Sequence, residues 1–183
     1  MIDYMPYQCY NMLMDIRYIA GLFDGEGSVG IYRNRNKDHI GFSLRTQVTQ
    51  NKNSGSTEIM SYLKERFGGN VSEQKTLSGD TKYNWQLNAG KAAKFLKEML
   101  PHLILKRDQA DIAIAWQDQR PTRVRDERGR ISLSHPHNKE LNEQVSNFIK
   151  RLKKEDIDVV MEDAKDLVEI KHTLRQIVNV KGD

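Results

Sequence analysis

The chain has 183 residues and a formal net charge of +4, a length that fits one domain, or one domain with a helical appendage, and allows a sizeable core. Its single cysteine, Cys9, excludes a disulfide within the chain and a zinc site built from cysteines. The first residues lack a secretory signal pattern, and no stretch has the roughly 18 apolar residues of a membrane span, so we expect a soluble protein with no membrane partner. The modest positive charge suits a phosphate-binding surface only if it gathers on one face.

Regular patterns begin after an N-terminal extension, residues 1–14. Asp15 can cap a first helix, and later alternation of apolar and polar residues predicts strands with one buried and one wet face. In chain order we predict a helix over 16–24, strands over 28–34 and 40–49 joined by a charged, asparagine-rich hairpin turn, a helix over 56–67 that ends at two glycines, strands over 70–76 and 83–88, and helices from 90 or 91 up to 100 and over 105–117. The first seven elements therefore follow the order α-β-β-α-β-β-α.

A change in composition separates a core, residues 15–119, from a C-terminal part, residues 120–183. The C-terminal part begins with an irregular basic loop over 121–138. Its arginines could grip a DNA backbone or could lie in a solvated loop. From Lys139 onward the pattern predicts two amphipathic helices, which we expect to pack on the core.

The wet face of the predicted strands is rich in hydrogen-bonding side chains rather than in the lysine and glutamate of an ordinary solvated face. The members that we assign to DNA binding are Tyr32, Asn34, Ser43, Arg45, Gln47, Ser72, Gln74, Lys82, Asn84 and Gln86. Arginine can pair with guanine in the major groove, and asparagine or glutamine can pair with adenine. A solvent face that is rich in amides explains the same composition, but the scarcity of Asp and Glu favours a surface that faces phosphates.

The most informative run lies at the end of the first helix, where residues 18–28 read Tyr-Ile-Ala-Gly-Leu-Phe-Asp-Gly-Glu-Gly-Ser. Ala20, Gly21 and Gly25 are small, so this helix can approach another helix closely. Glu26 lies where the helix ends, and its carboxylate projects from the tip. If the partner is the same helix of a second subunit, two-fold symmetry brings two Glu26 carboxylates together. Such a pair must be protonated or bridged by cations, and Mg²⁺ prefers these oxygen ligands.

Residues 19–27 resemble the nine-residue signature of the LAGLIDADG homing endonucleases, and a single copy is visible, as in the homodimeric branch of that family. The resemblance extends to residues 42–50, which read Phe-Ser-Leu-Arg-Thr-Gln-Val-Thr-Gln, and to 101–109, which read Pro-His-Leu-Ile-Leu-Lys-Arg-Asp-Gln. It covers residues 15–119, whereas the C-terminal helices correspond only loosely. The resemblance implies an α+β fold with a curved antiparallel DNA-binding sheet.

The resemblance also implies a site-specific endonuclease of the intron-homing kind. Such an enzyme makes a double-strand break with short 3′ overhangs in a long pseudo-palindromic DNA target, by Mg²⁺-dependent hydrolysis, and acts as a homodimer. The residues implied at the dimer interface are Ala20, Gly21, Asp24 and Gly25. Glu26 and the Gly25 carbonyl would hold Mg²⁺, for which Mn²⁺ would substitute. Gln50 would order water or metal, and Lys106 would stabilise charge on the phosphate.

The chain departs from the family pattern in two places. The common metal-binding acid is Asp, where this chain has Glu26, and the arginine that follows the second strand has no counterpart beyond Lys52. The alternative function is an RNA maturase that binds its own intron RNA, or a DNA-binding protein of the same fold that does not cut. Retention of Glu26, Gln50 and Lys106 favours the nuclease, while the sequence leaves the DNA target and the cellular compartment open.

Overall fold

The computed structural model describes residues 15–36, 39–120, 123–125, 131–133 and 139–155. Its elements in chain order are α2 (Ile16–Glu26), β1 (Gly27–Asn36), β2 (His39–Asn51), α3 (Ser54–Phe67), β3 (Asn70–Lys75), β4 (Thr81–Asn88), α4 (Ala89–Met99), the 3₁₀ turn η1 (Leu100–His102), α5 (Arg107–Asp118), β5 (Arg123–Arg125), β6 (Ile131–Leu133) and α6 (Lys139–Arg151). The predicted α-β-β-α-β-β-α order is confirmed from α2 to α4. No helix in these ranges is long and apolar enough to cross a membrane.

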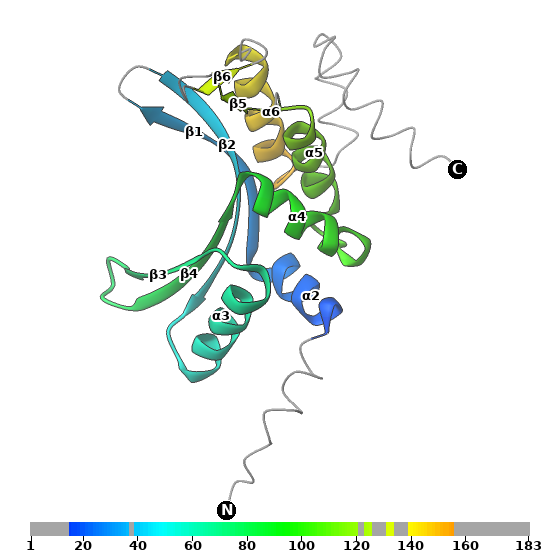
Figure 1. The fold of residues 1–183 in the computed structure, drawn as a ribbon. Coiled ribbons are helices and arrows are strands. Elements are labelled where there is room, and N and C mark those ends of the chain that lie inside the picture. Colours follow the sequence, from blue (N-terminus) through cyan, green and yellow to red (C-terminus); the bar gives the residue numbers. More distant parts are fainter. Residues whose placement is uncertain (1–14, 37–38, 121–122, 126–130, 134–138, 156–183) are drawn as a thin grey trace, which may run out of the picture.

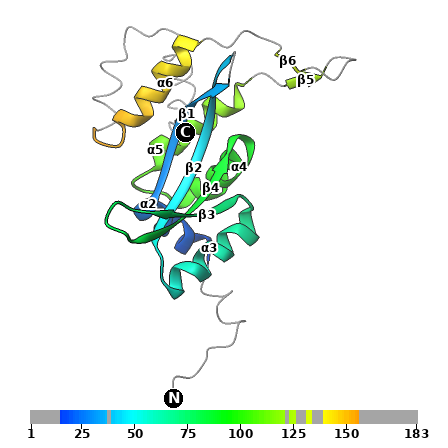
Figure 2. The same cartoon turned by 90° about the vertical axis from the view of Figure 1, so that its left-hand side faces the viewer.

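Four antiparallel strands form a curved sheet in the order β1-β2-β4-β3. Figure 1 shows the described helices on the convex side of this sheet, and Figure 2 looks onto the concave side, in front of which none of them lies. The alternation of side chains along each strand explains why helices cover only one face of the sheet. Phe42, Leu44 and Val48 of β2 are buried, whereas the residues between them on the concave face keep contact with solvent. The predicted α+β fold with a curved antiparallel sheet is confirmed.

Local signals in the sequence set the ends of the first two helices. The Asp15 carboxylate accepts a 3.4 Å hydrogen bond from the backbone N–H two residues further on and begins α2. Asn53 and Ser56 form a reciprocal capping box, so α3 begins two residues earlier than predicted. Gly68 and Gly69 follow α3 with φ angles of 74° and 91°, a backbone conformation that favours glycine and ends the helix.

Two segments differ from the prediction. Residues 35 and 36, expected in a hairpin turn, continue β1, and the last pair with β2 joins Asn36 to His39, because backbone pairing continues whether or not the side chains are apolar. The segment 121–138, expected to be irregular, contains the paired strands β5 and β6, which are too short to show an alternating pattern. The rest of the basic loop, the N-terminal extension and the second C-terminal helix lie outside the described residues.

An aromatic cluster lies at the centre of the core between the sheet and the helices. The Phe95 ring of α4 makes edge-to-face contacts with Phe23, Phe67 and Trp85, at 5.1, 5.0 and 5.2 Å between ring centroids. Trp85 is fully buried, and its indole N–H donates a 2.8 Å hydrogen bond to the carbonyl of Gly68. The cluster therefore holds α2, α3 and α4 against β4.

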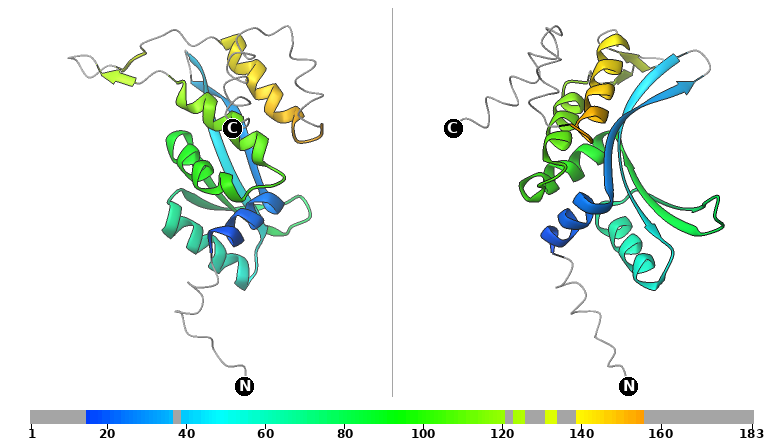
Figure 3. Two further views of the ribbon diagram at one scale, coloured as in Figure 1. Left: turned by 90° about the vertical axis from the view of Figure 1, so that its right-hand side faces the viewer. Right: turned by 180° about the vertical axis from the view of Figure 1, so that it is seen from behind.

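Helix α6 packs on β1 and α5, although it follows the predicted boundary between the two parts of the chain (Figure 3). Val145, Phe148 and Ile149 enter the same hydrophobic core as the buried side of α2. The buried hydroxyl of Ser146 donates a 2.7 Å hydrogen bond to the carbonyl of Ile31 in β1. Packing thus makes α6 continuous with the core of the sheet and the other helices.

Replacement of Phe95 by alanine removes the ring at the centre of the aromatic cluster and leaves a cavity. We expect the free energy of unfolding to fall by about 3–5 kcal/mol, measured by urea denaturation with tryptophan fluorescence. Leu77→Ala is the matched control, because Leu77 is exposed in the turn between β3 and β4, and its effect should stay within about 0.5 kcal/mol. Equal losses in the two variants would contradict the central position of Phe95.

Candidate active site

Helix α2 has one face in the core and one face open to solvent. Ile19, Ala20 and Phe23 are buried, Ala20 with 0% of its surface exposed. A Cβ atom added at Gly21 or Gly25 would meet nothing within 4 Å, so these two glycines lie on the open face. Ala20, predicted at the contact with a second subunit, packs inside the chain, because a turn of about 100° per residue carries it to the inner face beside its buried neighbours.

Asp24 is buried, and its carboxylate is used within the chain. Its Oδ2 accepts a 2.7 Å hydrogen bond from the backbone N–H of Ile104, and its Oδ1 accepts one of 3.0 Å from that of Lys106. Hydrogen bonds from backbone N–H groups to a charged carboxylate are stronger than neutral ones. Asp24 therefore joins the end of α2 to the start of α5, and its carboxylate, predicted at the dimer interface, is engaged within the chain.

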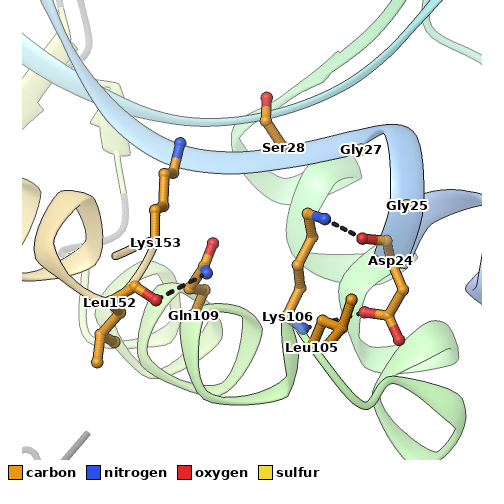
Figure 4. A pocket seen from close by; sticks show the side chains of 9 residues that line it. All are labelled: Asp24, Gly25, Gly27, Ser28, Leu105, Lys106, Gln109, Leu152 and Lys153. Carbon is orange, nitrogen blue, oxygen red and sulfur yellow. Dashed lines mark hydrogen bonds between the residues drawn. The ribbon is translucent and has the colours of Figure 1, made fainter. Parts of the chain in front are cut away.

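The side chain of Lys106 returns to the same end of α2. Its ammonium donates a hydrogen bond to the backbone carbonyl of Asp24 (Figure 4). Burial lowers the pKa of the Lys106 ammonium, and the nearby carboxylates of Asp24 and Glu26 raise that pKa in partial compensation. Lys106 is therefore a partly desolvated cation next to the helix end that carries Glu26.

These groups form one wall of a pocket of about 470 Å³ between the end of α2, the start of α5 and the residues that follow α6. The residues that line it are Asp24, Gly25, Gly27, Ser28, Leu105, Lys106, Gln109, Leu152 and Lys153 (Figure 4). Of these residues, the sequence predicts site roles for Asp24, Gly25 and Lys106 alone. Gln109 and Lys153 were not predicted, because no local pattern reveals which distant segments pack beside α2.

Glu26 is the last residue of α2, and its side chain is exposed. The final carbonyls of a helix, including that of Gly25, lack partners within the helix. No group of three or more His, Cys, Asp or Glu side chains that could hold a metal lies in the part of the chain that the structure describes. The oxygen donors at the tip nevertheless fit Mg²⁺, which keeps several waters and often takes only one or two carboxylates plus a phosphate.

Gln50 lies near the end of β2, two residues beyond Val48, which pairs with Gly27 at the start of β1. This register places Gln50 level with the end of α2. By alternation its side chain belongs to the convex face, together with that of Val48. Gln50 is absent from the pocket lining, so the structure brings it close to the level of Glu26 but not into the wall that contains Lys106.

Lys52, the candidate for the arginine of the family pattern, is engaged with other residues. Its ammonium lies 2.9 Å from Oε1 of Glu73 and 5.3 Å from the centroid of the Tyr83 ring. The hydrogen bond with Glu73 raises the pKa of Lys52. Because its charge is already paired, Lys52 is a poor candidate for a second phosphate-binding cation.

All ten of the predicted DNA-binding residues lie on the concave face of the sheet. Backbone pairing aligns them in rows across the strands, for example Gln47 with Gln86 and Lys82 with Gln74. The strand side chains described on this face include no Asp or Glu, since Glu73 belongs by alternation to the opposite face. The concave face therefore offers hydrogen-bond donors and acceptors without a carboxylate that would repel phosphates.

Neighbouring side chains constrain three residues of this face. The Arg45 guanidinium lies 4.7 Å from the centroid of the Tyr32 ring, and Gly30 makes room for that ring, since a Cβ there would lie 2.8 Å from it. Asn84 is only 7% exposed, and its Oδ1 accepts a 3.3 Å hydrogen bond from the hydroxyl of Thr49. Asn84 therefore offers little surface for the DNA contact predicted for it, whereas Tyr32 and Arg45 form a stacked pair.

Three large apolar side chains near the open face of α2 are exposed. Tyr18 of α2 is 47% exposed, and Ile104 and Leu105, which precede α5, are 84% and 74% exposed. Their exposure was not predicted, because the apolar run before Lys106 also fits the buried start of a helix, which the pattern predicts from Leu105 onward. These side chains and the two open glycines give this end of the chain an exposed apolar surface.

Replacement of Asp24 by asparagine keeps the shape of the side chain but leaves one of the two backbone N–H groups without an acceptor. We expect the free energy of unfolding to fall by about 1.5–3 kcal/mol, measured by chemical denaturation. Asp118→Asn is the control, because the Asp118 carboxylate forms an exposed ion pair with Lys97, and its loss should cost at most about 1 kcal/mol. An Asp24→Asn protein as stable as the control would show that the two bonds contribute little.

A comparison with known proteins agrees with this arrangement. A family model described as LAGLIDADG endonuclease matches residues 19–108, and a search of curated proteins gave no match. The solved structure of the homing endonuclease I-CvuI in complex with the I-CreI target has a TM-score of 0.56 and 15% identity, and the match covers 86% of this chain and 97% of that chain. The archaeal intron-encoded homing endonuclease I-Vdi141I, complexed with DNA, has a TM-score of 0.51 and 16% identity, with 82% and 94% covered.

At these identities the two solved structures show the fold, and the family model carries the assignment. The matched residues begin in α2 and end in α5, so they include the helix tip with Glu26 and the segment with Lys106. The chain belongs to the LAGLIDADG endonuclease family and carries one copy of the family motif.

Proposed function

We propose that the protein is a site-specific homing endonuclease that cuts both strands of a long pseudo-palindromic DNA target and leaves short 3′ overhangs. One observation carries the proposal. The exposed carboxylate of Glu26 and the ammonium of Lys106 lie together at the end of α2, where the carboxylate-free concave sheet begins. A metal-binding acid next to a phosphate-binding cation, at the edge of a polar sheet, is an arrangement that suits phosphodiester hydrolysis.

Double-stranded DNA is the substrate that the concave face favours. Curved antiparallel strands fit the major groove, where arginine pairs with guanine and asparagine or glutamine pairs with adenine. Arg45, stacked on Tyr32, and the row of Gln47 and Gln86 are placed for such contacts. The solved complexes of I-CvuI and I-Vdi141I with DNA support this choice of substrate.

Glu26 and the Gly25 carbonyl would hold Mg²⁺, and Mn²⁺ would substitute for it. A bound divalent ion would supply an activated water and neutralise charge that develops on the scissile phosphate. The Lys106 ammonium would stabilise the same negative charge from the protein side, and Gln50 would order water near the end of the helix. Residues 15–119 would form the catalytic core, with residues 120–183 as its C-terminal part.

A second copy of the chain completes the proposed site. One chain supplies one exposed carboxylate at the end of α2, and two-fold packing of two such helices would bring two Glu26 side chains together. Gly21 and Gly25 leave room for this approach, and Tyr18, Ile104 and Leu105 provide exposed apolar surface around it. This set replaces the predicted interface in two respects, because Ala20 and the Asp24 carboxylate face inward.

The rival function is binding without cleavage, either as an RNA maturase that recognises its own intron RNA or as a DNA-binding regulator. Such a protein needs the polar sheet but has no use for an exposed carboxylate beside a desolvated lysine. The positions of Glu26 and Lys106 therefore favour the nuclease. A maturase activity in addition to cleavage is compatible with the positions of Glu26 and Lys106.

Cleavage of a large pool of DNA, followed by sequencing of the new ends, tests the nuclease directly. With Mg²⁺ we expect discrete double-strand breaks at one pseudo-palindrome, and none with EDTA. Glu26→Gln should slow single-turnover cleavage by about 10²–10³-fold, because the amide loses the charge that holds the metal. Glu58→Gln, on the exposed side of α3, is the matched control and should cut like the original. Tight binding to a selected site without cleavage in Mg²⁺ or Mn²⁺ would instead establish the binding protein.

Gly21→Glu tests the dimer without disturbing the chain itself. The side chain would extend into open space but would place a charge where the second helix approaches, so we expect the dimer to dissociate at least about tenfold more readily (a loss of ~1.4 kcal/mol). Analytical ultracentrifugation would measure this dissociation. Gly90→Glu, in the first turn of α4 and also facing open space, should leave it unchanged. The interface lies elsewhere if both variants dimerise like the original.

A further inference from the structure

We propose that Lys153 is a second phosphate-binding residue of the active site and that the C-terminal part of the chain delivers it. The inference rests on the proposed function and extends it, because it gives a chemical role to a segment outside the family motif. Lys153 follows α6 and lines the same pocket as Lys106 and Gly25. In Figure 4 Lys153 enters from the end of α6 and Lys106 from the start of α5, with Gln109 between them.

Several contacts fix the segment that carries Lys153. The buried Asn142 accepts a 2.8 Å hydrogen bond from the indole N–H of Trp116, and the Ser146 hydroxyl donates to β1. Next to Lys153 itself, the Gln109 amide N–H donates a 3.2 Å hydrogen bond to the carbonyl of Leu152. The position of Lys153 is therefore set by the packing of α6 on α5 and β1.

Gln109 holds a buried, unpartnered oxygen between the two lysines of the pocket. The residue is only 5% exposed, and because its amide nitrogen bonds Leu152, its Oε1 is directed into the pocket (Figure 4). This buried oxygen has no hydrogen-bond partner among the described residues. A buried acceptor without a partner costs free energy, and a hydrogen bond from a neighbouring ammonium would satisfy it, so Gln109 favours a cation on this side of the pocket.

Lys153 differs from the neighbouring cations of the described residues in its lack of a partner. Nearby cations on α6 have partners, since Arg151 pairs with Glu155 and Lys150 donates to Asn147. The ammonium of Lys153 has no hydrogen bond or ion pair to any residue in the described ranges.

Lys153 as a whole residue is exposed, but its ammonium is partly shielded from water. That burial lowers the pKa of Lys153, and the positive charges of Lys106 and Lys150 lower it further. Two neighbouring ammonium groups repel each other unless an anion lies between them. A phosphodiester oxygen would relieve this repulsion and accept a charge-assisted hydrogen bond from each.

Lys153 also supplies the second cation that would act beside Lys106. Lys52, close to the place of the arginine in the family pattern, is paired with Glu73 and stacked on Tyr83. Lys153 reaches the pocket without such a partner. The cation would thus come from beyond α6 rather than from the end of β2.

Lys153→Gln and its neighbour Lys154→Gln form a matched pair, because Lys154 is exposed and does not line the pocket. The probe is the tightest DNA duplex selected from a random-sequence pool in EDTA, so binding is measured without metal. Each phosphate contact contributes about 0.9 to the slope of log affinity against log salt. We expect Lys153→Gln to reduce this slope by about 0.9 per chain and Lys154→Gln to leave it unchanged. Equal slopes for the two variants and the original would overturn the proposal.

Cleavage of the selected duplex with Mg²⁺ separates this inference from the proposed function. If the original protein cuts, Lys153→Gln should slow single-turnover cleavage by about 10²-fold, with an unchanged melting temperature. Combination with Lys106→Gln should slow it less than the product of the single effects, because both ammonium groups would act on one phosphate. If the original binds but does not cut, the nuclease proposal fails, while the salt slope still decides whether Lys153 contacts a phosphate.

Discussion

The arrangement of the site depends on one buried carboxylate. Asp24 accepts hydrogen bonds from the backbone N–H groups of Ile104 and Lys106, about 80 residues further along the chain. An asparagine would leave one of those N–H groups without an acceptor in a partly buried place, and an alanine would leave both. The bonds hold the start of α5 against the end of α2, and the Lys106 ammonium then reaches the Asp24 carbonyl. Without these bonds the end of α2 and the Lys106 ammonium would have no fixed position relative to each other.

Helical geometry explains why two acids so close in sequence have opposite tasks. Asp24 and Glu26 are two residues apart, and about 100° of rotation per residue places them on nearly opposite sides of α2. Asp24 therefore faces the core, where it pairs with backbone donors, and Glu26 faces solvent, where it is free to bind a metal. The same rotation separates Ala20, which packs inside, from Gly21 and Gly25, which stay open.

Patterns within single elements were enough to predict the sheet and its polar face. In β2 and β4 apolar and polar residues alternate, and this alternation assigns each side chain to one face of the sheet. Because helices cover only one face, the apolar residues mark that face, as the buried Phe42 and the concave-face Gln47 illustrate. The predictions of Glu26 and Lys106 came from resemblance, Glu26 through the motif and Lys106 through residues 101–109. Lys153 could not be found in this way, because its place depends on how α6 packs against α5 and β1. The bond between Asn84 and Thr49 was equally hidden, since it depends on the pairing of β2 with β4.

The packing of α6 argues against a loose appendage at the C-terminal side of the core. Val145, Phe148 and Ile149 lie in the same hydrophobic cluster as Ile19 and Phe23 of the motif helix. Any movement of α6 would expose those side chains and break the bond between Gln109 and Leu152. The pocket therefore has the complete set of positive charges only when α6 is docked. Binding of a phosphate between those charges would in turn stabilise the docked helix, because a ligand that prefers one state shifts the equilibrium towards it.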